Sequence, residues 1–220
     1  MEPSEIANPQ VHDLLQIDVD SRQWSAVDGP TWVGETLAAC PWVVVRRAQA
    51  SAGQIAVGVR GPSRGERWGC FIGKDLIRKV VSPAQLVTPA RSPSHNLRTP
   101  PFLSLQQLSE RWCDLTLPWG PTGSLGFELA TGRQVTTSLS DLDIAIRAGE
   151  RISREQARWL WEHALGLQTK VDIRVETPEC GFSLEEYAST SSRMLLRYPD
   201  RGELGNDPWA KALQPATGAK

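Results

Sequence analysis

Three aspartates in two short apolar segments have the spacing of a metal-dependent site. Asp141 and Asp143 lie two residues apart in residues 140–146, and Asp172 lies in residues 171–177. Side chains alternate along a strand, so Asp141 and Asp143 share one face and leucine and isoleucine occupy the other. If the two segments are neighbouring strands, three carboxylates gather on one face, and their repulsion raises the pKa of at least one. Mg²⁺ would relieve that repulsion, because it prefers carboxylate oxygens together with substrate phosphates.

A glycine-rich turn precedes the first of these segments. Residues 119–126 read Trp-Gly-Pro-Thr-Gly-Ser-Leu-Gly and follow an apolar run. Glycine lets backbone N–H groups approach phosphate oxygens, and a serine hydroxyl adds a donor, so Gly123 and Ser124 are candidate phosphate ligands. The segment is neither a Walker loop nor G-x-G-x-x-G. Taken singly, each motif has a plain alternative: an ordinary turn here, and the solvent-facing side of an antiparallel sheet for Asp-x-Asp.

Basic residues are concentrated in the middle of the chain. Residues 41–98 hold ten Lys and Arg against two acids, a net of +8, between flanks of −6 (residues 1–40) and −3 (residues 99–220). Such a stretch is a candidate docking surface for an anion, or it neutralises its own flanks. Alternation places Arg174 on the face of Asp172, where it meets a phosphate or pairs with the acids.

The elements that must position these groups fall into two parts. β-Branched runs at 41–48 and 54–61 predict a hairpin, and residues 67–77 predict a third strand with a turn at Gly73. Residues 10–88 are therefore predicted to form a small β-rich domain. A Pro- and Ser-rich linker is predicted at 89–101 and a second domain at 102–210.

Helices are predicted in the second part from capping boxes followed by apolar stripes. The boxes are Ser104 with Gln107, Ser153 with Gln156, and Ser183 with Glu186. Gly166 suits the end of the second helix, and the third is predicted to run through Leu195. The fold class is thus α+β, with a β-rich N-terminal domain before a mixed-sheet domain with flanking helices.

Composition excludes several classes of protein. The chain has 220 residues, 40% hydrophobic, and a net charge of −1. A disordered chain and a generally basic nucleic-acid coat are excluded, so no nucleic-acid partner is expected. No apolar stretch is long enough for a bilayer, and Met1 to Gln10 lack the pattern of a secretory signal. The cysteines are expected to be reduced, mostly buried thiols of a cytoplasmic protein, because they form no paired motif; they are Cys40, Cys70, Cys113 and Cys180.

In combination the motifs resemble the nucleotidyltransferase superfamily signature. The elements that match, in order, are Gly123-Ser124 after a strand, Asp141 and Asp143 on the next, and Asp172 on a later one. The resemblance implies that the first two acids bind two Mg²⁺ ions and that Asp172 is the third ligand or the general base. It also implies that the Gly-Ser turn holds the β- and γ-phosphates of a donor.

Longer segments resemble one family more closely, the phosphoribosyl-dephospho-CoA transferases of malonate decarboxylase, also called malonate decarboxylase holo-acyl-carrier-protein synthases. The resemblance covers most of the chain, and its most specific part runs from the Gly-Pro-Thr-Gly-Ser turn to Asp-Leu-Asp. The matching segments are residues 12–15, 43–48, 57–61, 119–132, 140–144, 171–178 and 206–209.

The family resemblance implies a reaction. The donor is 2′-(5″-triphosphoribosyl)-3′-dephospho-CoA, the acceptor is a serine of the acyl carrier protein subunit, and pyrophosphate is released. Arg46, Arg47 and Arg60 are then candidates to contact donor phosphates or the acidic carrier, unless they are solvated strand ends. Two alternatives are a nucleotidyltransferase that uses an ordinary nucleoside triphosphate and a non-catalytic carrier-protein-binding module. The sequence leaves open the oligomeric state, the role of His12 and which partner the N-terminal domain contacts.

Overall fold

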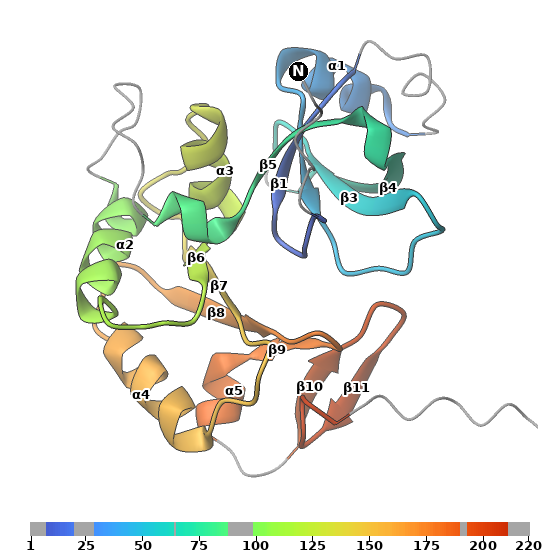
Figure 1. The fold of residues 1–220 in the computed structure, drawn as a ribbon. Coiled ribbons are helices and arrows are strands. Elements are labelled where there is room, and N and C mark those ends of the chain that lie inside the picture. Colours follow the sequence, from blue (N-terminus) through green and yellow to red (C-terminus); the bar gives the residue numbers. More distant parts are fainter. Residues whose placement is uncertain (1–7, 20–28, 64, 88–98, 190–192, 211–220) are drawn as a thin grey trace, which may run out of the picture.

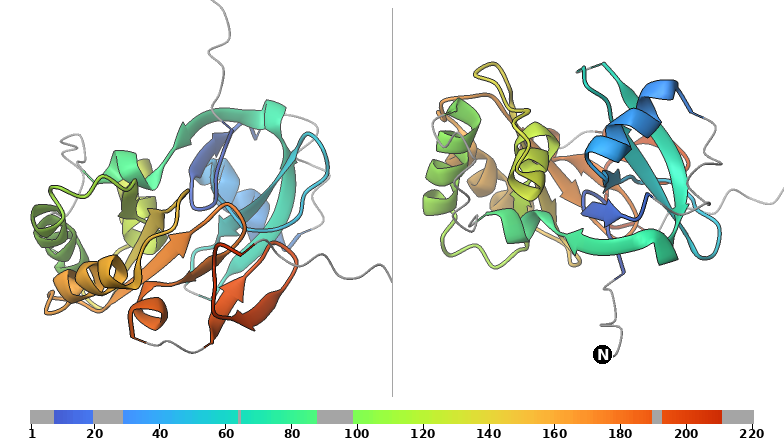
Figure 2. Two further views of the ribbon diagram at one scale, coloured as in Figure 1. Left: turned by 60° about the horizontal axis from the view of Figure 1, so that its bottom comes forward. Right: turned by 90° about the horizontal axis from the view of Figure 1, so that it is seen from above.

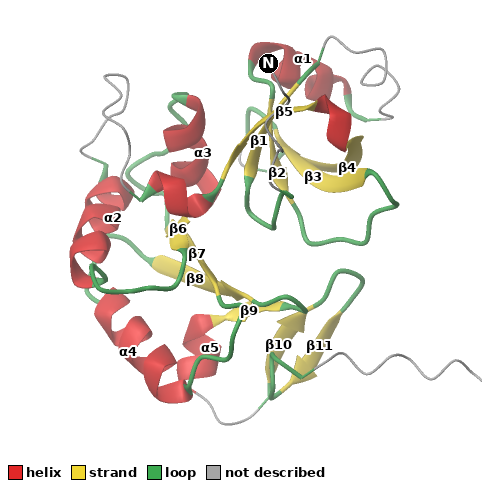
Figure 3. Cartoon of the chain, in the orientation of Figure 1, coloured by secondary structure: helices red, strands yellow, loops and turns green. Residues whose placement is uncertain are grey.

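The computed structural model describes residues 8–19, 29–63, 65–87, 99–189 and 193–210. Within these ranges the chain forms two sheets that lie side by side, an N-terminal one and a C-terminal one (Figure 1 and Figure 2). Helices cover the C-terminal sheet, while the N-terminal part is mostly strand (Figure 3). The predicted α+β class with a β-rich N-terminal part is confirmed.

The N-terminal sheet has the strand order β4-β3-β2-β1-β5, and each of its described pairings is antiparallel. The hairpin predicted at 41–48 and 54–61 is confirmed as β2 and β3. The predicted third strand ends at Gly73, and a 3-10 turn at 74–76 separates it from β5. Sequence reasoning missed three of the elements of this half, α1, β1 and β5. The elements are β1 (Leu14–Ile17), α1 (Thr31–Ala39), β2 (Trp42–Val45), β3 (Gln54–Arg60), β4 (Arg67–Gly73), η2 (Lys74–Leu76) and β5 (Ile77–Val81).

The two faces of the N-terminal sheet belong to different hydrophobic cores. Alternation along β1 sends Leu15 into a core with Val33 and Leu37 of α1. It sends Leu14 to the other face, where it joins Trp42 in the core of the C-terminal half. The two halves therefore share apolar surface instead of being joined by a linker alone.

A short 3-10 element, η3 (Pro83–Leu86), carries the chain from β5 onto the C-terminal sheet. It packs so closely on β6 that a Cβ at Gly120 would lie 1.9 Å from the carbonyl oxygen of Pro83. Leu86 is buried in the C-terminal core. Most of the predicted linker 89–101 lies outside the described residues, and α2 begins inside that range, at Pro100.

The C-terminal sheet has the order β11-β10-β9-β8-β7-β6. Among its described pairings β7 and β8 run parallel, joined by the crossover helix α4, and the others run antiparallel. Helices α2, α4 and α5 cover one face, and α3 and the N-terminal half lie on the other side (Figure 1). The elements are α2 (Pro100–Arg111), β6 (Trp119–Pro121), α3 (Gly123–Thr131), β7 (Leu142–Arg147), α4 (Arg154–Ala164), β8 (Val171–Glu176), β9 (Gly181–Ser183), α5 (Leu184–Ser189), β10 (Met194–Arg197) and β11 (Gly202–Gly205).

The predicted capping boxes have three different outcomes. The box of Ser153 and Gln156 is confirmed in full, and Gly166 follows α4 with φ +69°. The box at Ser104 is wrong, because α2 begins four residues earlier and Ser104 is a buried mid-helix residue.

At Ser183 only half of the predicted box forms. The backbone N–H of Glu186 lies 3.4 Å from the Ser183 hydroxyl, but the Glu186 carboxylate accepts from the N–H of Leu195. The helix does not run through Leu195, since α5 ends at Ser189 and Leu195 lies in β10.

The four cysteines are free, and Cys40, Cys70 and Cys180 are buried, while Cys113 is exposed. This agrees with the expectation of mostly buried thiols. In the described ranges no helix has the length and apolarity needed to cross a membrane.

Candidate active site

The acids predicted from the sequence meet across the parallel strand pair. β7 and β8 are neighbours, and their register sets Asp143 directly opposite Asp172. Leu142, Ile144 and Ile146 are fully buried on the helix-covered face, so the carboxylate of Asp143 projects from the opposite face. β7 begins at Leu142, so Asp141, which was predicted within the strand, lies directly before it. The expectation that the two segments are adjacent strands is confirmed. The sheet at this position is mixed, since β7 pairs in parallel with β8 and antiparallel with β6.

The pKa of Asp143 lies above its ordinary value. Burial of the carboxyl group is the largest cause, and the negative charges of Asp172 and Asp141 add to it. His12 and Arg174 act in the opposite direction. The expected mutual repulsion of the carboxylates is thus present at Asp143.

The glycine-rich turn packs directly against this carboxylate. Gly123 is the first residue of α3 and has φ +57°, a conformation that glycine adopts readily. A Cβ built on Gly123 would lie 1.9 Å from Oδ2 of Asp143. The backbone N–H of Thr122 also donates to the carbonyl oxygen of Asp143 at 2.8 Å. The start of α3 is therefore fixed beside the acids, where its free N–H groups favour anions.

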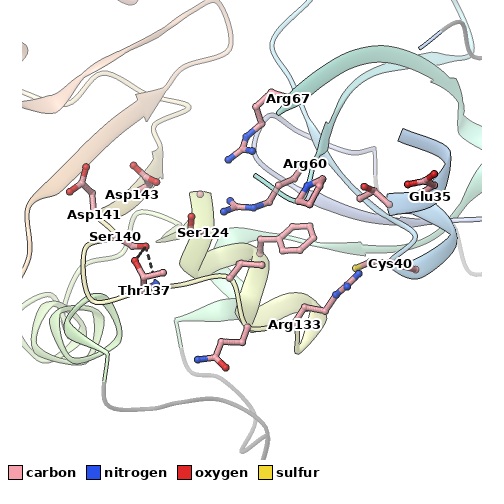
Figure 4. Close-up of a pocket in the computed structure, with 18 residues that line it drawn as sticks. Glu35, Cys40, Arg60, Arg67, Ser124, Arg133, Thr137, Ser140, Asp141 and Asp143 are labelled. Atoms are coloured by element: carbon pink, nitrogen blue, oxygen red, sulfur yellow. Dashed lines mark hydrogen bonds between the residues drawn. The ribbon is translucent and has the colours of Figure 1, made fainter. Parts of the chain in front are cut away.

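A cavity of about 870 Å³ opens between the two halves at this point (Figure 4). Its walls come from α1, the ends of β3 and β4, the start of α3, the loop that follows α3, and β7. This volume lies within the range of small-molecule sites, roughly 300–1,000 Å³. Among the predicted site residues it gathers Gly123, Ser124, Asp141, Asp143 and Arg60.

Two further predicted residues stand on the next strand, beside the cavity. Asp172 and Arg174 lie on β8 with their side chains partly exposed. Nη2 of Arg174 lies 3.4 Å from Oδ2 of Asp172. Of the two roles predicted for Arg174, the pairing with the acids is the one present in this structure.

Arg46 and Arg47 are placed elsewhere. Arg46 lies over the N-terminal sheet, and its Nε donates to the carbonyl oxygen of Val57 at 2.9 Å. Arg47 crosses to the other half, where Nε lies 3.2 Å from Oε2 of Glu176. Both line a second cavity, of about 540 Å³. Their role in substrate binding stays a prediction from the sequence.

His12 also has a partner that the sequence did not reveal. Its Nε2 lies 2.9 Å from Oε1 of Glu176, and its backbone has φ +71°. Burial alone would raise the pKa of Glu176, but His12 and Arg47 outweigh it and hold that pKa below its ordinary value. Beside this group, Arg147 Nη2 lies 2.6 Å from Oδ1 of the buried Asp13. These contacts hold the N-terminal half against the ends of β7 and β8.

Among the cavity residues that were not predicted as site residues are Arg67, Phe127 and Arg133. Figure 4 shows Arg133 near Cys40, away from the aspartates. The loop that carries Arg133 is organised by the buried Glu128, whose carboxylate accepts from the N–H groups of Val135 and Thr136 at 3.0 and 2.8 Å. Arg67 could have been recognised from the sequence as a site residue, because strands predicted at 54–61 and 67–77 pair it with Arg60, as the β3–β4 hairpin does.

The carboxylates of the site can supply part, but not all, of the coordination shell of a metal ion. In the described part of the chain, no three His, Cys, Asp or Glu side chains converge closely enough to hold a metal ion by themselves. Asp141 and Asp143 nevertheless line one cavity with Ser124. Mg²⁺ commonly takes one or two carboxylates, keeps several waters and completes its shell with substrate phosphates. The residues present fit an ion of that kind, bound together with a phosphate-bearing substrate.

Both halves of the chain match models of domains that belong to one protein family. Residues 10–83 match the phosphoribosyl-dephospho-CoA transferase MdcG N-terminal domain, and residues 86–208 match the C-terminal domain. Similar proteins named phosphoribosyl-dephospho-CoA transferase include one from Azotobacter vinelandii, 39% identical over 202 residues, which are 91% of this chain and 94% of the relative. One from Pseudomonas fluorescens is 38% identical over 213 residues, which are 96% of this chain and 100% of the relative. No solved structure matches the chain.

Proposed function

The chain belongs to the phosphoribosyl-dephospho-CoA transferase family, and from that premise we propose a specific group transfer. The enzyme moves the phosphoribosyl-dephospho-CoA group from 2′-(5″-triphosphoribosyl)-3′-dephospho-CoA to a serine of the malonate decarboxylase acyl carrier protein. The observation that carries the proposal is the register of Asp143 with Asp172 beside the cavity that Gly123 and Ser124 also line.

The proposed reaction is a displacement at phosphorus. The serine oxygen of the carrier forms a bond to the α-phosphorus of the donor. The bond from that phosphorus to the oxygen bridging to the β-phosphate breaks, and pyrophosphate leaves. The serine proton goes to Asp172 if that carboxylate is the base, or to solvent if it is a metal ligand. Catalysis of this kind rests on positioning and on neutralising charge.

Each residue of the proposed site has a role that suits its surroundings. Asp141 and Asp143 would hold the metal, since both line the cavity, Asp143 on β7 and Asp141 directly before that strand. Gly123 and Ser124 would bind the phosphates with backbone N–H groups and a hydroxyl at the start of α3. Arg174, which lies beside Asp172, would orient that carboxylate.

Mg²⁺, expected as two ions, would activate the attacking oxygen and neutralise the charge of the leaving group when bound. Support for this comes from Asp143, whose burial beside two other carboxylates disfavours its charge until a cation is present. Asp141 and Asp143, with Asp172 as the third ligand or base, are the residues that would hold it.

The remaining parts of the proposal concern the binding partners and the cellular location of the protein. The carrier protein would approach the open side of the cavity with its serine, and neither a nucleic acid nor a membrane takes part. A cytoplasmic location is proposed because the four cysteines are free, which suits a reducing compartment.

The test is the intact mass of the apo carrier subunit after incubation with this protein, Mg²⁺ and the triphosphoribosyl donor. We expect a gain equal to the phosphoribosyl-dephospho-CoA group, lost with EDTA and lost with Asp141→Asn. Asp114→Asn is the matched control, because Asp114 is exposed and lies outside both cavities described above.

Two results would contradict the proposal. A mass gain with ATP but none with the triphosphoribosyl donor would indicate a nucleotidyltransferase for ordinary nucleoside triphosphates. No gain with either donor, on a carrier that a related transferase modifies, would indicate a non-catalytic carrier-binding protein.

A further inference from the structure

Two arginines of the N-terminal sheet stand opposite each other at the edge of the cavity. Arg60 ends β3, Arg67 begins β4, and the antiparallel register pairs them directly. Residues paired in this way project from the same face of a sheet, and like charges in such a pair destabilise it. We call Arg60 and Arg67 the arginine pair.

The surroundings of the arginine pair hold both side chains toward the cavity. The guanidinium of Arg60 lies over the ring of Phe127 on α3, 5.9 Å from its centroid. Nη1 of Arg67 donates to the backbone carbonyl oxygens of Glu66 and Ser63 at 2.9 and 3.4 Å. The carboxylate of Glu66 accepts from the N–H of Ser63, within the same hairpin. These contacts fix the position of the hairpin end.

The arginine pair faces the Gly123-Ser124 turn across the cavity (Figure 4). Figure 4 shows both guanidinium groups extending from the N-terminal sheet toward Ser124 and the aspartates. Arg60 and Arg67 line the same cavity as Gly123 and Ser124. An anion held by the start of α3 would therefore meet two guanidinium groups on its other side.

We infer that the arginine pair binds the leaving diphosphate of the triphosphate donor, so that the N-terminal sheet recognises the donor rather than the carrier protein. Guanidinium groups suit phosphate because their donors match its geometry in a fixed plane. The location inside a cavity of about 870 Å³ favours a small molecule over a protein surface. The inference rests on the proposed function, since it takes the donor from it.

Binding of inorganic triphosphate in EDTA tests the inference without any metal. We expect Arg60→Gln and Arg67→Gln each to raise the dissociation constant at least about tenfold, which corresponds to about 1.4 kcal/mol, close to the lower end of the range for a hydrogen bond to a charged group. Arg67→Lys, which keeps the charge but not the fork, should lie between. Lys79→Gln is the control, because it removes one exposed positive charge from the same sheet outside the cavities described here. The dissociation constant of triphosphate from the Lys79→Gln protein should stay within about twofold of the wild-type value, because this exposed charge is remote from the ligand.

Steady-state kinetics separate donor recognition from carrier recognition. Arg67→Gln should raise the KM for the donor and the inhibition constant of pyrophosphate, with the KM for the carrier unchanged. A higher KM for the carrier with unchanged triphosphate binding would overturn the inference in favour of carrier recognition. Weaker binding of dephospho-CoA with unchanged triphosphate binding would overturn it too, because the arginines would then serve the other end of the donor.

Failure of the proposed function would look different. A wild-type protein that binds triphosphate through the arginine pair but transfers nothing to a competent carrier would leave the anion site in place and refute the transfer. Circular dichroism of each variant confirms that the fold is kept.

Discussion

At the scale of single residues, the contact between Gly123 and Asp143 leaves no room for a side chain at residue 123. The backbone at Gly123 has φ +57°, and the space a Cβ would fill belongs to Oδ2 of Asp143. Any side chain there must displace a carboxylate proposed to hold the metal. Glycine is thus required at this position for two independent reasons, conformation and space.

We therefore predict that Gly123→Ala lowers kcat for transfer by about 100-fold or more, the scale for a misplaced catalytic group, while the protein still folds. The left-handed conformation alone should cost about 1–2 kcal/mol of stability. Gly149→Ala is the control, since nothing lies within 4 Å of its Cβ position. The assay is the rate of carrier modification, with thermal unfolding of both variants alongside. Wild-type kcat in the Gly123→Ala protein would contradict the proposed position of Asp143 in the site.

The group of His12, Arg47 and Glu176 makes a prediction about pH. The pKa of Glu176 is below its ordinary value of 4.5, so in acid the unfolded chain takes up the proton first. The stability that the charged form provides is present above that value and is lost as the pH falls through the folded pKa. At pH 7 Glu176→Gln should lower the free energy of unfolding by about 1.5–3 kcal/mol, the range for hydrogen bonds to charged groups.

As the pH falls from about 4.5 through the folded pKa of Glu176, the difference between Glu176→Gln and wild type should shrink toward zero. Denaturant unfolding at a series of pH values measures it, and the exposed Glu150→Gln serves as control. A difference that persists unchanged at the acid end of the series would mean that the charge of Glu176 is not what stabilises the contact.

The local and the non-local parts of the site differ in how far sequence could predict them. The faces of β7 and β8 follow from alternation alone, so Asp143 and Asp172 were predicted with their orientation, whereas Asp141 lies directly before β7. The contact of His12 with Glu176 joins residues 164 positions apart and depends on how the two halves dock. No local pattern carries that information, which is why His12 had no partner at the sequence level and Arg47 was expected at a substrate.

At the scale of elements, two serines that look alike in the sequence have opposite surroundings. Ser153 caps α4 and accepts from the N–H of Gln156 at 3.0 Å. Ser104 is buried within α2, and its hydroxyl has no hydrogen-bond partner among the described residues. The Pro100-Pro101 pair starts α2 earlier than Ser104, because proline suits the first turn of a helix.

Replacing each serine by alanine should therefore have different effects on stability. Ser153→Ala should lower the free energy of unfolding by about 1 kcal/mol, the usual value of an N-cap. Ser104→Ala should not lower it, since the change removes a buried polar group without a partner. Chemical denaturation of both variants under the same conditions gives the comparison. A loss of stability at Ser104 equal to that at Ser153 would contradict the assignment of the helix start.

Short elements were the part of the fold that sequence reasoning missed. β1, β5 and β11 have four or five residues each, too few for a period to be recognised. The long periodic stretches at β3, β8 and α4 were predicted at nearly their observed positions. Pairing with neighbours, which local sequence does not encode, supplies the rest.

At the scale of the whole molecule, the two sheets share one of the hydrophobic cores. Leu14, Trp42 and Leu86 come from the N-terminal part of the chain but pack in the core of the C-terminal half. Ion pairs of Arg47 with Glu176 and of Arg147 with Asp13 add to this junction. The halves should therefore unfold together.

We predict a single cooperative transition, with tryptophan fluorescence and far-ultraviolet circular dichroism coinciding. Leu86→Ala should lower the free energy of unfolding by about 2–5 kcal/mol without splitting the transition, as for other large-to-small core changes. Leu204→Ala, at a residue that is 61% exposed, should change it by no more than about 0.5 kcal/mol. Two separate transitions in the wild-type protein would show that the halves are independent.

The parallel pairing of β7 with β8 also determines when the site can form during synthesis. Asp143 and Asp172 become neighbours only after α4 and the rest of the crossover have closed a long loop. The β3–β4 hairpin, which sets Arg60 opposite Arg67, needs only local contacts and leaves the ribosome far earlier. The acids thus come together only after β8 has been made, when most of the chain has left the ribosome. A nascent or truncated chain that ends before β8 would carry the arginines of the cavity but not its catalytic centre.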